Sequence, residues 1–86
     1  MASIQDVQAQ LAAGKQSAQQ ALRALGTATA EVDKALQQIS GAAQGTNHPK
    51  VQQSVAALTQ ARAKAQEMQQ LLVAGHQAVT EYSGQL

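Results

Sequence analysis

The 86-residue sequence lacks most of the residues that build a large core or a reactive site. It has no cysteine, no phenylalanine and no tryptophan, and Tyr82 is the only aromatic residue. Without cysteine there is neither a disulfide framework nor thiolate chemistry. Aromatic side chains normally supply much of the buried area of a core, so any core here is expected to be thin. Packing of helix on helix is the architecture that best tolerates such a core.

Charge and long apolar runs are also scarce. Charged residues make up 13% of the chain and the net charge is +1, so nucleic acid is not an expected partner. No run of about 18 apolar residues occurs, which argues against stable membrane insertion. The first residues lack the basic region and apolar segment of a signal peptide. The expected location is the cytoplasm, and secretion without a signal peptide is kept as an alternative.

What the chain does have is alanine, glutamine and a seven-residue repeat. Alanine and glutamine are good helix formers. The large row of the repeat consists of Ile4, Leu11, Ala18, Leu25, Val32 and Ile39, followed by Val51, Leu58, Ala65, Leu72, Val79 and Leu86. Three positions later lies a small row: Val7, Gly14, Ala21, Ala28, Ala35 and Ala42, then Ser54, Ala61, Met68, Gly75 and Tyr82. Alternating steps of three and four residues indicate a coiled coil whose two rows face the partner helix.

The repeat is interrupted once, by a segment rich in turn-forming residues. Gly41 or Gly45 suits the left-handed conformation that closes a helix. Pro49 suits the first turn of the next helix, with Asn47 or His48 at its N-cap. The predicted fold is therefore all-α, one domain over residues 1–86: a helix at about 3–43, a turn at about 41–49 and a helix at about 49–84, paired as an antiparallel coiled-coil hairpin.

A turn centred near residue 45 also predicts which residues lie level with each other. Ala18 then faces Leu72, and Ala65 faces Leu25, so small residues meet large ones across the interface. Gly14 and Gly75 are expected to bring the two backbones close together. The first helix is predicted to be continuous, and Gly26-Thr27 is its expected weak point because glycine costs about 1 kcal/mol in a helix interior.

Some apolar residues are left outside this predicted interface. Leu22 and Leu36 flank it on the first helix, and Val55, Leu71 and Val73 lie beside it on the second. A contiguous exposed apolar stripe usually marks a partner. We interpret these five residues as candidate interaction residues. The expected partner is a second copy, which would give a homodimeric four-helix bundle, or another helical protein. The alternative is scattered surface residues that need no partner.

The sequence predicts no catalytic, cofactor-binding or metal site. His48 and His76 are the only histidines, and neither has a second ligand at a zinc spacing. Glu31 and Asp33 are two positions apart, so on a helix they point to different faces. The serines have no histidine base within reach of a simple register. Weak adsorption of the amphipathic helices to a lipid interface stays a lesser alternative, because bulky aromatics and a basic face are missing.

The turn carries a family resemblance. Gly45-Thr46-Asn47-His48-Pro49 and the helix that follows resemble small uncharacterised actinobacterial proteins with a Gly-x-x-His-Pro turn between two Ala-rich helices. This resemblance implies a hairpin and no particular activity. In size and topology the chain is also similar to the WXG-type (ESAT-like) secreted hairpins. It departs from them in having no Trp-x-Gly in the turn and no acidic residue in the C-terminal Tyr82–Leu86.

The first functional hypothesis is a non-enzymatic helical module that self-associates or binds a partner helix. The second, which rests on the resemblance to the WXG-type hairpins, is a secreted effector or a carrier protein for secretion. A small enzyme or ligand binder would require polar groups that converge between the helices, and the two rows contain almost none. The interaction module is therefore the function that the sequence favours.

Overall fold

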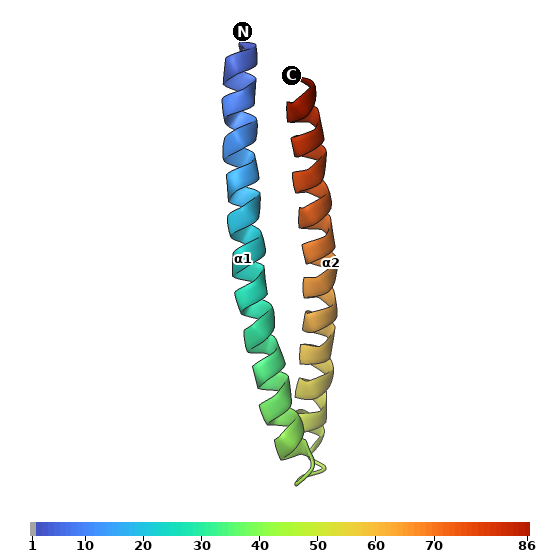
Figure 1. Cartoon of the computed structure of the whole chain (residues 1–86). Helices are drawn as coiled ribbons and strands as arrows, with labels where there is room; N and C mark the ends of the chain where they lie inside the picture. The colour runs from blue at the N-terminus through green and yellow to red at the C-terminus, as the bar shows by residue number, and fades with distance from the viewer. Residues whose placement is uncertain (1) are drawn as a thin grey trace.

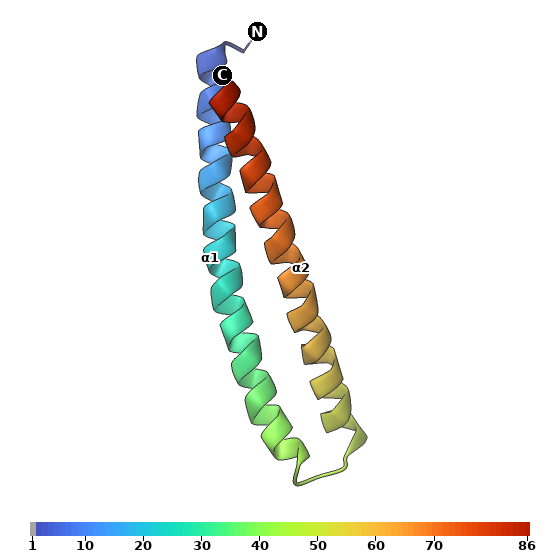
Figure 2. The same ribbon diagram turned by 45° about the vertical axis from the view of Figure 1, so that its right-hand side comes forward.

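The computed structural model describes residues 2–86, which form two long antiparallel helices. Helix α1 spans Ile4–Ala43 and helix α2 spans Pro49–Gln85. Figures 1 and 2 show both termini at one end of the hairpin and the connecting turn at the other. The molecule measures 63 × 20 × 15 Å. The prediction of an all-α antiparallel two-helix hairpin is confirmed.

Both helices begin at side-chain caps. The Ser3 hydroxyl accepts a hydrogen bond from the Asp6 backbone N–H at 3.1 Å, and the Asp6 carboxylate accepts one from the Ser3 N–H at 3.2 Å. This reciprocal capping box satisfies two amide groups that have no partner inside the helix. At the start of α2, His48 Nδ1 accepts from the Lys50 N–H at 3.1 Å, and Pro49 occupies the first helical turn. Of the two predicted N-caps, His48 is the one used.

The end of α1 differs from the prediction. No glycine among the described residues has a positive φ, so neither Gly41 nor Gly45 adopts the left-handed conformation. The chain leaves the helix through tighter hydrogen bonds instead: the Gln44 N–H donates to the Gly41 carbonyl at 3.3 Å and the Gly45 N–H to the Ala42 carbonyl at 3.0 Å. Bonds of this three-residue type satisfy the last carbonyls without a left-handed residue.

The expected weak point at Gly26-Thr27 does not interrupt α1, which stays helical throughout. The Thr27 hydroxyl donates to the Arg23 carbonyl at 3.2 Å, and the Thr29 hydroxyl donates to the Leu25 carbonyl at 2.8 Å. These bonds to the preceding turn give both hydroxyls a partner within the helix. The continuous first helix is therefore confirmed.

The hairpin has no buried core, since none of the described residues is fully buried. Its apolar side chains are at best half-buried along the line where the helices meet. Most members of the large row take these half-buried positions: Leu11, Ala18, Leu25, Val32, Ile39, Val51, Leu58, Ala65, Leu72 and Val79. Two helices alone leave one side of each such residue open to solvent. The pairing therefore removes only part of the apolar surface from water.

The second row at this interface is not the predicted one. Most of the small row is exposed, including Gly14, Ala21, Ala28, Met68 and Tyr82. A third row, four positions after the large row, takes its place. Its half-buried members are Lys15, Leu22, Thr29, Leu36, Ala43, Val55, His76 and Ser83. A rotation that brings leucine and valine to the interface removes more apolar area from water than one that brings alanine there.

The predicted close approach of the backbones at Gly14 and Gly75 is wrong. A Cβ placed on either glycine would meet no atom within 4 Å. The two residues do lie at the same level, because both line one hollow between the helices together with Ala18 and Leu72. The predicted level of Ala18 and Leu72 is thus confirmed, whereas the glycines leave space between the helices.

Candidate interaction surface

The large apolar side chains that stay exposed are concentrated near the termini. Leu71 is 72% exposed and Met68 is 54% exposed. Among residues 2–86 these side chains are Ile4, Met68, Leu71, Val73, Tyr82 and Leu86. Five of the six belong to the second half of α2 or to the residue after it. Exposed apolar residues gathered on an extended hairpin indicate an interaction surface.

The five residues predicted to bind a partner fall into two groups. Leu71 and Val73 are exposed on α2. Leu22, Leu36 and Val55 are half-buried, because they belong to the third row and face the other helix. Leu71 and Val73 are thus available to a partner in the isolated hairpin, and the other three mainly pack within it. Binding by any of the five stays a prediction.

Two hollows lie between the helices on the side of the exposed small row. The distal hollow has a volume of about 240 Å³ and is lined by Gly14, Lys15, Ala18, Leu71, Leu72, Gly75, His76 and Val79. The middle hollow has a volume of about 340 Å³ and is lined by Ala21, Ala24, Leu25, Ala28, Met68 and Leu72. Leu72 lines both, so the two hollows adjoin. The small residues of α1 and the larger ones of α2 together form an almost entirely apolar depression.

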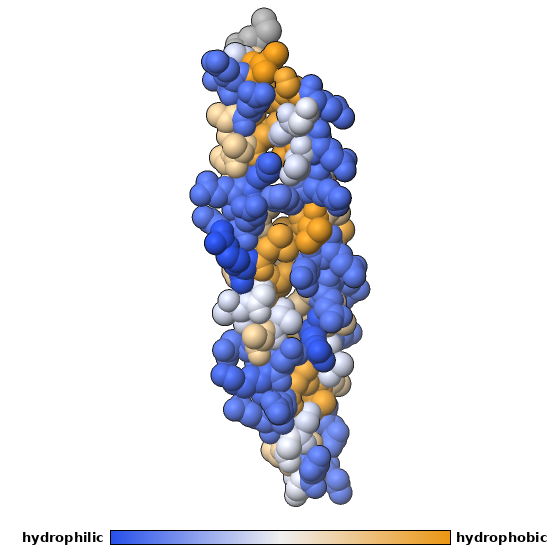
Figure 3. Space-filling model, in the orientation of Figure 1, coloured by the Kyte–Doolittle hydropathy of each residue, from blue (hydrophilic) through white to orange (hydrophobic). Residues whose placement is uncertain are grey.

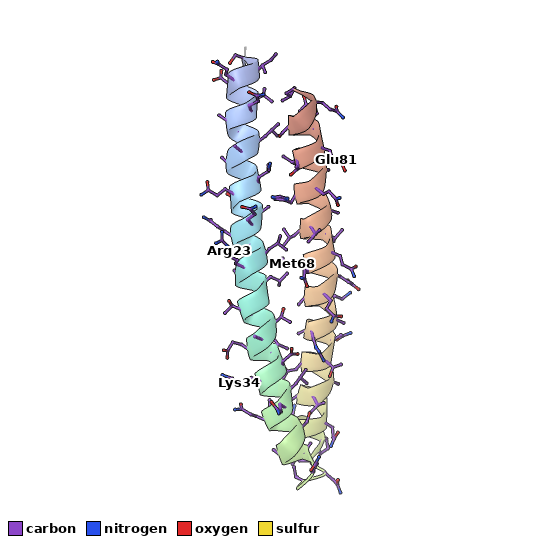
Figure 4. All side chains as sticks on the ribbon, in the orientation of Figure 1. Arg23, Lys34, Met68 and Glu81 are labelled. Carbon is purple, nitrogen blue, oxygen red and sulfur yellow. The ribbon has the colours of Figure 1, made fainter. Side chains whose placement is uncertain are left out.

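A further hollow of about 360 Å³ is lined by Leu22, Val73, His76, Gln77 and Thr80. Figure 3 shows one face of the molecule, where hydrophobic surface gathers along the line between the helices and is flanked by hydrophilic surface. Figure 4 shows Arg23 and Lys34 on the side of α1 away from α2, and Glu81 on the outer side of α2. These three charged side chains point away from the line between the helices.

His76 is the polar residue that sequence reasoning passed over. Its side chain lines two of the hollows, and its Nε2 atom is shielded from solvent and has no hydrogen-bond partner. The signal for this placement was its position four residues after Leu72, on the third row. His48 lies at the opposite end, as the cap of α2. Within residues 2–86, no three His, Cys, Asp or Glu side chains come together as metal ligands could.

Within the part of the chain that the structure describes, one ion pair connects the helices. Arg62 Nε lies 2.9 Å from Asp33 Oδ1. Asp33 Oδ1 is shielded from solvent but makes no aligned hydrogen bond, so this is a contact of charges in which the N–H does not point at the oxygen. The two side chains are 51% and 45% exposed, which weakens their attraction through solvent screening. The pair therefore contributes little to the stability of the hairpin.

Comparison with known proteins does not identify a family. No family model, no curated protein and no solved structure matches the chain significantly. In the described part of the chain, neither helix combines the length and the hydropathy needed to cross a bilayer. The interaction surface is accordingly characterised by its own geometry.

Proposed function

We propose that this protein is a non-enzymatic helical interaction module that self-associates, with two hairpins packing into an antiparallel four-helix bundle. The observation that carries this proposal is the absence of any fully buried residue within residues 2–86. A folded domain needs buried apolar area to offset the conformational entropy that ordering costs. A second hairpin laid on the first would cover the open sides of the half-buried rows and so supply that area.

The surface area of the hairpin supports the same conclusion. Its accessible surface is 6433 Å². A compact monomer of its mass, 8.9 kDa, is expected to expose about 4,800 Å². The excess of about 1,600 Å² is twice the area of about 800 Å² that each partner buries in a protein–protein interface of standard size. One hairpin therefore carries enough surplus surface for a stable dimer.

The overall dimensions agree with this conclusion. The radius of gyration is 19.2 Å, compared with about 12 Å for a globular chain of 86 residues. When two hairpins pack side by side, the helices keep their length and the molecule becomes thicker. Its ratio of surface to volume therefore falls. The four-helix bundle is the simplest object in which these two helices acquire a core.

Sedimentation equilibrium over concentrations from micromolar to millimolar tests the proposal directly. We expect a mass of twice 8.9 kDa at the upper end and a melting temperature that rises with protein concentration. A strict monomer across the range, with one unchanging melting temperature, would overturn self-association. It would leave a helical partner of different sequence as the occupant of the surface.

A second candidate function is export as a WXG-like effector or secretion carrier. This function is supported by the two-helix topology, with a short turn between long helices. Membership of the actinobacterial proteins with a Gly-x-x-His-Pro turn is a separate proposal, and only Gly45–Pro49 supports it. The test is to locate the protein in a cell that produces it, with a cytosolic marker as the control for lysis. Recovery in the medium without that marker would favour export; retention in the cells would reject it.

A further inference from the structure

One exposed row of α2 alternates in size along its length. It consists of Ala61, Met68, Gly75 and Tyr82, seven residues apart, and all four are exposed. The order is small, large, small, large. Both large members project: Met68 is 54% exposed and Tyr82 is 50% exposed. We call these four residues the contact row.

This order has a specific property. When the row is reversed and laid against itself, each large residue meets a small one. Reversal of a segment against its own copy is what a two-fold axis perpendicular to a helix produces. A partner of unrelated sequence would have no reason to be complementary to this order, whereas a second copy is complementary to it automatically.

We propose that the contact row is the line along which two hairpins meet, α2 against α2 of the second copy, with the two-fold axis at the level of Leu71 and Leu72. This assignment rests on the self-association proposed above and specifies its geometry. Met68 then faces Gly75 of the second copy, and Ala61 faces Tyr82 of the second copy. Its two end members are 21 positions apart, which corresponds to about 32 Å of helix.

The distal hollow is the place where the Met68 side chain of the second copy enters. Gly75 and Gly14 both line it, and a Cβ on either one would meet nothing within 4 Å. Its volume of about 240 Å³ exceeds the roughly 150 Å³ of an apolar cavity that accommodates benzene. An unbranched thioether is well suited to fill an irregular apolar space of this kind.

Two further features suit contact between two copies: the exposure of Leu71 and the lack of charge in the contact row. Leu71 lines the distal hollow and is 72% exposed, so the proposed axis brings the Leu71 side chains of both copies under cover. The contact row contains no charged residue. A charge in the row would face an apolar or small residue of the second copy and would be buried there without a partner.

The test exchanges the two central residues of the contact row. Gly75→Met should weaken dimerisation at least 30-fold, measured by sedimentation equilibrium, because two methionines would then compete for one space. Met68→Gly should weaken it by a similar factor, because a gap is left between two glycines. The double variant Met68→Gly/Gly75→Met restores one large and one small residue at each contact. It should return the dissociation constant to within about threefold of the wild type.

Gly26→Met is the matched control. A Cβ on Gly26 also meets nothing within 4 Å, and Gly26 lines neither the distal nor the middle hollow. It should dimerise as the wild type does. Circular dichroism should show undiminished helicity in Gly75→Met and in the double variant, which has the same number of glycines as the wild type.

The outcomes separate the two proposals. If the wild type dimerises and Gly75→Met dimerises equally well, the contact row is not the interface, and self-association stands through another face. If both single variants weaken the dimer and the double variant does not restore the dissociation constant, residue 68 does not face residue 75 of the second copy. If the wild type is monomeric, both proposals fail together.

Discussion

The half of the hairpin next to the turn and the half next to the termini use the same two helices in different ways. In the turn half, residues 25–65, the large side chains Val32, Leu36, Ile39, Val51, Val55 and Leu58 are all half-buried. In the terminal half, residues 2–24 and 66–86, lie all six large apolar residues that stay exposed. Large side chains thus pack between the helices in both halves, and only the terminal half also presents large apolar side chains to a partner.

The third row accounts for the difference. In the turn half its half-buried members are Thr29, Leu36, Ala43 and Val55, three of which are apolar. In the terminal half they are Lys15, Leu22, His76 and Ser83, of which only Leu22 is apolar. Polar side chains contribute less apolar area there, so the helices leave the distal hollow between them. The five-residue turn adds to the contrast, because it keeps nearby residues of both helices close at little entropic cost.

The largest expected effect comes from placing a charge in the turn half. Leu36→Asp should unfold the hairpin, because the carboxylate would lie half-buried without a partner, at a cost of about 3 kcal/mol to a marginally stable fold. Loss of the helical circular dichroism signal at 25 °C is the measurement.

Leu71→Asp is the matched change in the terminal half. Because Leu71 is 72% exposed, the change should cost a single hairpin little, and self-association should weaken by tenfold or more. If Leu36→Asp and Leu71→Asp lose helicity equally, this contrast between the two positions is wrong.

A smaller effect is expected at His76. His76→Leu removes the shielded Nε2 atom that has no partner, and it should stabilise the hairpin by about 1 kcal/mol. A thermal melt at fixed protein concentration should show a rise of about 5 °C. His48→Leu is the control and should lower the melting temperature, since it removes the cap on the Lys50 N–H. An unchanged or lower melting temperature for His76→Leu would show that the imidazole nitrogen is satisfied by water.

The smallest expected effect belongs to the ion pair between the helices. A double-mutant cycle of Asp33→Ala and Arg62→Ala should give a coupling energy of about 0.5 kcal/mol, because both side chains are about half exposed. The coupling should decrease further in 0.5 M salt. The exposed pair Lys64–Glu67 within α2 provides the comparison. A coupling above about 2 kcal/mol would mean that the pair is a major stabilising contact of the turn half.

Much of the fold could be predicted because its signals are local. Pro49 fixes the start of α2 through well-understood capping chemistry. The large row is a period of seven residues held without a slip, and it lies along the interface as predicted. The level of Ala18 and Leu72 follows from the position of the turn alone.

The rotation of the helices about their axes could not be predicted in the same way. The small row is apolar except for Ser54, and this pattern favoured Ala21 and Ala28 over Lys15 and Thr29 as interface residues. Burial is decided by side-chain size, and a few residues such as Leu22 and Leu36 outweigh several alanines. Long polar residues such as Lys15 tolerate a position at the interface, because their apolar stems can pack there while their charged ends reach solvent. The exposed surface near Met68 follows from this rotation and was missed for the same reason.

Because both termini lie at one end of the hairpin, the molecule sets a fixed distance between its termini and its turn (Figure 1). A group attached near Ala2 and one attached near Gln85 would stand together, whereas a group attached to the turn would stand up to 63 Å away. Two hairpins joined about an axis at Leu71 would extend in opposite directions from their overlap. Their turns would then become the two far tips of one longer rod, separated by more than the length of a single hairpin.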